Sequence, residues 1–172
     1  YDQIDSFTYG NPNPEVAGFL WKYQHYSSTL DIHKLVQHIT TYIQTTWTQE
    51  ASMHSVLSVL RFYKYVDMKT KEAIYTDIQE VVDRVVEFDS SKWNEYTLEP
   101  YKIARIEPLF LEKHKDVLKE NIALYEEKIQ SDVIRPNWKW YQFEDTCKQV
   151  IDDWIPLLNY DVLYVIKNRR EQ

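Results

Sequence analysis

Two short stretches, KWNEYTLEP and PNWKW, gather aromatic and acidic side chains of the kind that line ligand pockets. Aromatic rings supply apolar walls, while a carboxylate can orient a ligand or transfer a proton. Together the stretches supply five candidate pocket residues: Trp93, Tyr96, Glu99, Trp138 and Trp140. The alternative is that the tryptophans only brace the corners of helical hairpins, because burial of indole rings stabilises a fold by roughly 25 cal/mol per Å².

His54 is a sixth candidate, as an acid–base group or ligand contact on a helix that we expect to be central. The alternative for His54 is a buried histidine held by a hydrogen bond. His33 and His38 are five residues apart, which places them on different sides of a helix, and neither belongs to a zinc-binding helical motif. The histidines therefore predict no metal site.

No other motif predicts a metal or a cofactor. Cys147 is the only cysteine, so an internal disulfide is excluded, and its acidic neighbours disfavour a reactive or metal-binding thiolate. Asp152 and Asp153 are adjacent, and adjacent side chains on a helix point about 100° apart, which keeps them from sharing a proton. We expect this pair to cap a helix that restarts near Trp154. Two glycines cannot form a glycine-rich phosphate loop, and Gly18 inside a helix predicts a close helix crossing.

Composition narrows the classes of partner. The formal net charge of -7 disfavours non-specific binding to nucleic acid or to anionic membranes, since both attract clustered Lys and Arg. The basic cluster of Lys167, Arg169 and Arg170 lies near the C-terminus, where a helix end favours cations. No apolar run approaches the ~20 residues that a membrane-spanning helix needs, and the first residues do not form a signal peptide. With a single cysteine, these features predict a cytoplasmic protein.

Apolar residues recur at helical spacing through most of the chain, and glycine is scarce, so we predict an all-α fold. In the valine-rich stretch, Val81-Val82 and Val85-Val86 repeat with period four, which favours a helix over a strand. Pro14 suits a first helical turn, Ser28 or Asp31 suits an N-cap, and Pro156 predicts a break between two helices. The expected helices span these residues: 14–26, 28–47, 50–66, 68–88, 108–130 and, in two pieces, 143–172, with short helical turns between 89 and 104.

The succession of helices predicts antiparallel hairpins, in a partial or small toroid-like array, within a single domain of residues 1–172. A sequence that lacks an initiator Met suggests a fragment of a longer protein. The surface aromatics leave a homodimer open.

Five motifs carry a resemblance to a known family: NPEVAGFLWKY, SMHSVLSVLRFYK, DSSKWNEYTLEPYKIA, IQSDVIRPNWKW and DDWIPLLNYDVLYVIKN. In this order they resemble a family of uncharacterised bacterial proteins, whose hairpins are similar to those of the squalene-cyclase and prenyltransferase superfamily, the alpha-alpha toroids. That superfamily has a Gln…Gly-Ser-Trp motif that ties hairpins together. Gln130, Asp132 and Trp138 resemble it, with Val133 in place of glycine. The resemblance implies that Trp138 and Trp140 brace a hairpin corner.

The catalytic motifs of that superfamily are incomplete here. In the Asp-x-Asp-Asp motif of the class II cyclases, Val150 stands at the first aspartate, and Pro156 interrupts the Asp-Asp-x-x-Asp motif of the class I enzymes. Two hypotheses follow. The chain is a non-catalytic helical module that binds a partner or an apolar small molecule, or it is an enzyme, or half of one, acting on a terpenoid-like or sugar-like substrate. The enzyme hypothesis predicts that KWNEYTLEP and PNWKW converge on one pocket.

Overall fold

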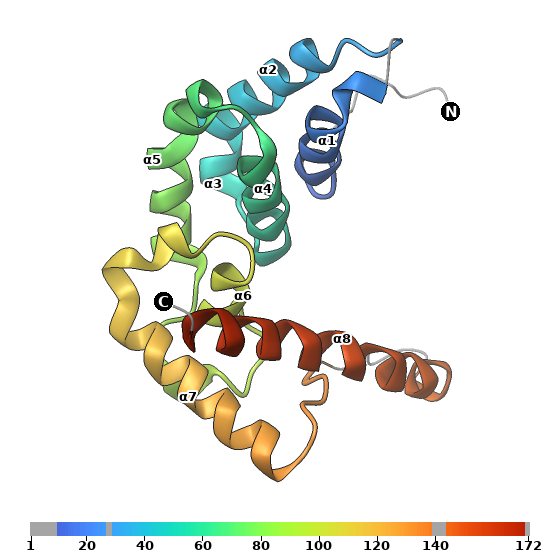
Figure 1. Cartoon of the computed structure of the whole chain (residues 1–172), viewed down its shortest axis with the longest axis vertical. Coiled ribbons are helices and arrows are strands. Elements are labelled where there is room, and N and C mark those ends of the chain that lie inside the picture. Colours follow the sequence, from blue (N-terminus) through green and yellow to red (C-terminus); the bar gives the residue numbers. More distant parts are fainter. Residues whose placement is uncertain (1–9, 27–28, 139–143, 171–172) are drawn as a thin grey trace. The chain divides into compact units, whose positions relative to one another are not determined.

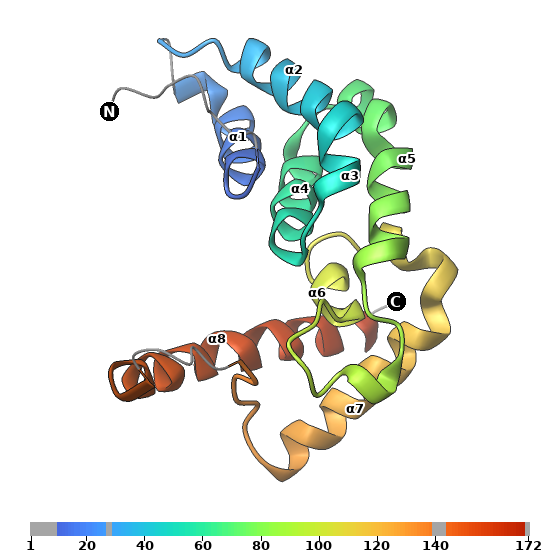
Figure 2. The same cartoon turned by 180° about the vertical axis from the view of Figure 1, so that it is seen from behind.

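A computed structural model describes residues 10–26, 29–138 and 144–170 of the chain, with the side chains of 144–149 and 170 left aside. Every regular element within these ranges is a helix, which confirms the all-α prediction (Figures 1 and 2). The sequence predicted one domain; the chain divides into two compact units, residues 1–85 and 86–172, and each is described by itself.

Unit 1 contains the expected succession of amphipathic helices. Its elements are α1 (Asn13–Lys22), η2 (Gln24–Tyr26), α2 (Ile32–Tyr42), η3 (Ile43–Trp47), α3 (Thr48–Glu50), α4 (Met53–Tyr65) and α5 (Met68–Val85). Asp31 caps α2 as predicted, because its carboxylate accepts a hydrogen bond from the Lys34 N–H at 3.0 Å. The other predicted cap, Ser28, lies outside the described residues. The valine-rich stretch is helical through Val85, so the helix prediction for it is confirmed.

A π-helical turn, η3, continues α2 and delivers Trp47 to the core of unit 1. The Trp47 side chain is fully buried, and its indole N–H donates to the Ser55 hydroxyl at 2.9 Å. Ser55 also completes a capping box with Ser52 at the start of α4. One hydroxyl therefore satisfies a buried indole and a helix terminus together.

Helices α1 and α4 cross closely at Gly18, as the sequence predicted. A Cβ at this position would lie 2.9 Å from the Phe62 Cα and 3.1 Å from the Arg61 carbonyl oxygen. Polar contacts reinforce the crossing: the Glu15 N–H donates to the buried Ser58 hydroxyl at 3.1 Å, and Arg61 pairs with Glu15 at 3.0 Å. Only a residue without a side chain permits this approach of two backbones.

We predict that Gly18→Ala destabilises the protein although alanine is the better helix former. The added methyl meets backbone atoms, so the helices must separate, and overpacking of this kind costs ~1–3 kcal/mol. The matched control is Gly10→Ala, where the new Cβ would meet only the Tyr42 hydroxyl at 3.5 Å. Urea unfolding of both variants checks the prediction. Equal stability of Gly18→Ala and the wild type would contradict the close crossing.

Unit 2 is built from shorter pieces around two long helices. Its elements are η4 (Ser90–Lys92), α6 (Pro100–Ala104), η5 (Pro108–His114), α7 (Lys115–Ser131) and α8 (Glu144–Arg170). The turn, break and second turn predicted for residues 89–104 are present as η4 and α6. The helix expected over residues 108–130 begins instead with a 3₁₀ segment, and its α-helical part starts at Lys115.

The predicted break at Pro156 is wrong, because α8 continues through it. Pro156 and Asp152 are both exposed, so the Asp152 carbonyl that loses its helical donor lies where water can solvate it. The expected capping role of Asp152 and Asp153 is wrong for the same reason: both are exposed residues in the interior of α8.

The core of unit 2 forms where α6, α7 and α8 meet. Its buried members are Tyr101, Ile122, Tyr125, Val162, Val165 and Ile166. A polar anchor joins α6 to α8: the Arg105 guanidinium pairs with Asp161 at 2.8 Å and lies 3.9 Å from the centre of the Tyr164 ring. These contacts help to fix α6, which carries Tyr101 and Lys102 and has Glu99 as its N-cap.

Candidate functional site

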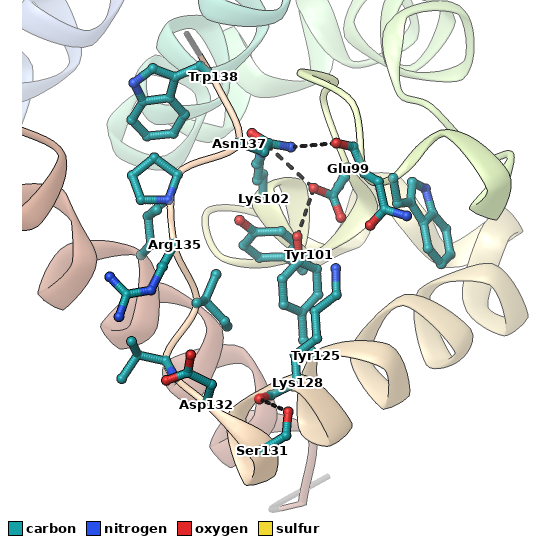
Figure 3. Close-up of a pocket in the computed structure, with 16 residues that line it drawn as sticks. Glu99, Tyr101, Lys102, Tyr125, Lys128, Ser131, Asp132, Arg135, Asn137 and Trp138 are labelled. Carbon is teal, nitrogen blue, oxygen red and sulfur yellow. Dashed lines mark hydrogen bonds and ion pairs between the residues drawn. The ribbon is translucent and has the colours of Figure 1, made fainter. Parts of the chain in front are cut away.

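A cavity of about 280 Å³ lies within unit 2, between α6, the C-terminal half of α7 and the segment 132–138 (Figure 3). Leu158 of α8 and Trp93 complete its wall. The segment is held at both ends by side-chain amides. Asn159 of α8 exchanges hydrogen bonds with the Ile134 backbone at 2.9 and 2.8 Å, and Asn137 donates to the Glu95 carbonyl at 2.7 Å.

Glu99 is the buried charge at the centre of this site. It is 1% exposed and sits immediately before α6, where its extended backbone forms the helix N-cap. One carboxylate oxygen accepts from the Tyr125 hydroxyl at 2.8 Å, and the other accepts from the Asn121 amide at 3.1 Å. Both partners lie on α7, so the carboxylate joins two helices. A buried carboxylate held by several donors is stable where an unpartnered one is not.

Asn121 connects the same two helices a second time. It is fully buried, and its carbonyl oxygen accepts from the Tyr101 N–H in the first turn of α6 at 2.9 Å. That N–H has no partner within the helix, as is usual for the first turn. The Asn121 amide thus satisfies one helix terminus with its oxygen and the Glu99 carboxylate with its nitrogen.

Lys102 places an amine beside Glu99. Its Nζ donates to the Thr97 carbonyl oxygen at 2.8 Å and lies 3.8 Å from the Glu99 carboxylate. The side chain is only 23% exposed. Burial lowers the pKa of the Lys102 ammonium, and the neighbouring Glu99 charge opposes that shift without cancelling it.

Two tyrosines form the floor of the cavity. The rings of Tyr101 and Tyr125 pack with centroids 4.6 Å apart, and both residues are buried. Burial raises the pKa of both hydroxyls, and the Glu99 charge raises them further. The two hydroxyls therefore remain neutral donors at neutral pH.

The rim carries aromatic and cationic groups. The Lys128 Nζ lies 5.0 Å from the centre of the Tyr125 ring and extends toward the Glu99 cluster, whereas the Arg135 side chain points away from it (Figure 3). Trp138 is half-buried, and the centroid of its ring lies 5.9 Å from that of Tyr96 and 5.7 Å from that of Trp154.

Comparisons of this chain with protein-family models, curated proteins and solved structures found no match. The resemblance to the toroid superfamily stays a prediction, and the site is interpreted from its own geometry.

The structure brings together the two stretches that the sequence singled out. Trp93, Glu99 and Trp138 line the same cavity, and Tyr96 contacts Trp138 at its edge. Trp93 is also a brace, because it is 1% exposed and its indole N–H donates to the Glu87 carbonyl at 2.8 Å. Trp140 lies outside the described residues.

His54 does not line this cavity. It belongs to unit 1, in the first turn of α4, and is exposed, so the expected buried histidine on a central helix is wrong. The sequence placed His54 inside because α4 is apolar on several faces, but the buried positions of its first turn are Ser55 and Val56, and His54 lies on the exposed side. Sequence reasoning missed four cavity residues, Tyr101, Lys102, Tyr125 and Lys128, and also Asn121, which holds Glu99 in place. Asn121, Tyr125 and Lys128 follow each other at i, i+4 and i+7, a spacing that places them on one face of α7.

Other parts of the described chain contain fewer features of a functional site. The described residues include no group of three or more His, Cys, Asp or Glu side chains that could hold a metal ion. Within the same residues no helix is long and apolar enough to cross a membrane.

Unit 1 has a more open cavity of about 290 Å³ beside Trp21 and His33, whose rings meet edge to face with their centroids 4.9 Å apart. Among the residues described there, no buried charge lines it.

We predict that Tyr125→Phe costs ~1–2 kcal/mol of stability at neutral pH, because Glu99 loses a hydrogen-bond donor. The variant should also lose less stability above pH 10. A tyrosine in the unfolded chain ionises near its ordinary pKa of 10.0, whereas the raised pKa of folded Tyr125 keeps its proton bound. The wild type's stability therefore falls as pH rises past 10, by about 1.4 kcal/mol per pH unit for each such group.

Denaturant unfolding between pH 7 and 11 measures both effects. Tyr26→Phe is the control, since Tyr26 is 82% exposed. This variant should have the same decrease in the free energy of unfolding per pH unit above pH 10 as the wild type. If the free energy of unfolding decreases equally with pH in the wild type and in Tyr125→Phe, the fold does not keep Tyr125 protonated.

Proposed function

We propose that this protein is a helical binding module whose unit 2 cavity takes a small organic anion. The observation that carries the proposal is a preformed set of polar groups that line an open space: Glu99, Tyr125 and Lys102 are already oriented by one another, and the buried Asn121 holds Glu99 from behind. Ligand sites are largely preformed concavities with a few placed polar groups. A fold gains little stability from burying a charged network, which favours a binding role for this one.

The charges around the cavity favour an anion. Lys102 is paired with Glu99, so these two charges largely neutralise each other. Lys128 reaches the same space, and among the described residues no carboxylate lies within ion-pair distance of its ammonium. Asp132 is directed to the backbone, where it accepts from the Val133 N–H at 2.7 Å. A ligand carboxylate would give Lys128 the partner that the described part of the chain does not supply.

The lining also favours a polar ligand over the apolar ligands considered from the sequence. A cavity of about 280 Å³ is at the lower limit of small-molecule sites, and its walls carry Ser131, Asn137 and Asn94 besides the charged residues. Ser131 and Asn137 already donate to backbone carbonyls, but their oxygen atoms can accept further hydrogen bonds, which a polar ligand can donate and an apolar terpenoid cannot. A small polar molecule is the better fit.

The setting of this function is proposed on the sequence alone. One cysteine in 172 residues suits a reducing interior, so we propose a cytoplasmic location. The toroid-like array and the bacterial origin are further proposals from the resemblance. Native mass spectrometry tests the remaining option, a homodimer.

Titration with succinate, inorganic phosphate and glucose tests the anion site. We expect succinate to shift the indole N–H resonance of Trp138, assigned with Trp138→Phe, and glucose to leave it in place. Lys128→Gln should weaken succinate binding by about tenfold, the value of one charge-assisted contact of ~1.4 kcal/mol.

The matched control is Lys119→Gln, because Lys119 is on the same helix but pairs with Asp116 at 2.8 Å on the exposed face. If both variants weaken succinate binding equally, the loss of positive charge in general, and not a contact with Lys128, explains the effect. Binding of glucose but not of succinate would overturn the choice of ligand class.

A further inference from the structure

We propose that the Lys102 amine forms an imine with a small aldehyde or 2-oxo acid bound in the unit 2 cavity. This inference rests on the proposed function, because the anionic end of such a ligand would occupy the site beside Lys128. It goes further by assigning a covalent step to one nitrogen atom and a carbonyl group to the ligand.

The hydrogen bonding of Lys102 is the first argument. The described residues offer its Nζ one hydrogen-bond acceptor, the Thr97 carbonyl oxygen at 2.8 Å, and the Glu99 carboxylate is an ion-pair neighbour at 3.8 Å. An ammonium has three N–H donors and would leave two without a protein acceptor among these residues. Transfer of one proton away removes an unpartnered donor and gives the nitrogen a lone pair that can attack a ligand.

The surroundings of the nitrogen give the second argument. Lys102 is mostly buried, and its Nζ lies 5.7 Å from the centre of the Tyr101 ring, yet it lines the cavity that Lys128 also reaches (Figure 3). Burial lowers the pKa of the Lys102 ammonium, which increases the fraction of neutral amine at a given pH. Amines desolvated in this way are the ones that enzymes use to form imines.

Glu99 can carry the proton that the step requires. The Lys102 nitrogen attacks the carbonyl carbon, a C–N bond forms, and the carbonyl π electrons become an alkoxide. The Glu99 carboxylate takes a proton from the nitrogen and delivers it to the alkoxide oxygen, which gives a carbinolamine. The nitrogen lone pair then expels the hydroxyl as the C–O bond breaks, and the remaining N–H proton passes through Glu99 to the departing oxygen, which leaves as water. The products are the imine and one water molecule.

Glyoxylate with sodium cyanoborohydride tests the proposal, since the reductant converts an imine to a stable secondary amine. The full-length wild-type protein is treated at pH 7, and the modified lysines are located by peptide mass spectrometry. We expect Lys102 to react at least tenfold faster than Lys119, which is exposed and paired with Asp116. Succinate should slow the reaction at Lys102 only. Comparison of lysines within one wild-type protein removes any dependence on how a variant folds.

The outcomes separate the two proposals. Uniform labelling of exposed lysines with no preference for Lys102 overturns the imine, even where succinate binds. Fast labelling of Lys102 that succinate does not slow supports the reactive amine and contradicts the anion site. A Glu99→Gln variant adds an independent measure: its labelling at Lys102 should be slower if Glu99 moves the proton, and unchanged labelling would overturn that role.

Discussion

The burial of one carboxylate governs the architecture of unit 2. A glutamate that is 1% exposed must find donors for both oxygens, because an unpartnered buried charge costs several kcal/mol. Glu99 finds them on α7, at Asn121 and Tyr125. The short α6 has only five residues and could not hold its own position by helical hydrogen bonding alone. It is fixed because its N-terminus and its N-cap side chain are both tied to α7.

The same ties create the cavity. Once α6 is held against α7, the side chains of Tyr101, Lys102 and Tyr125 have no freedom to fill the space between these helices and the segment that follows α7. That segment is held by Asn159 at one point and by the Glu95 carbonyl at another, and its Ile134 packs against the core of unit 2. Amides provide both attachments: Asn159 donates and accepts, and Asn137 donates to a backbone carbonyl. These bonds fix an irregular backbone that has no helical partner of its own.

The sequence predicts the helices, which follow from the periodicity of apolar residues. It does not predict features that depend on polar contacts between residues far apart in the chain. Helical spacing locates α2, α4 and α5, and Gly18 indicates a crossing because no other residue permits it. Pro156 gave a wrong prediction because the energetic cost of a proline inside a helix depends on its surroundings. The carbonyl that loses its N–H donor costs little where water can solvate it, and solvent exposure depends on the tertiary structure. Glu99 is singled out by its aromatic neighbours, but Asn121 lies 22 residues away, in a helix whose pattern looks fully amphipathic. Its role depends on a contact that no local pattern records.

The two interpretations of the tryptophans do not exclude each other. Trp93 lines the cavity, but its ring is buried and its indole N–H donates to a backbone carbonyl, so it also braces the fold. Trp138 is half-buried, borders the cavity and contacts two other rings, so it too forms part of the wall. Aromatic rings therefore shape the space, and the Glu99 and Lys102 pair adds the charged groups that a hydrophobic core of the same shape would not contain. The proposed function depends on these polar groups.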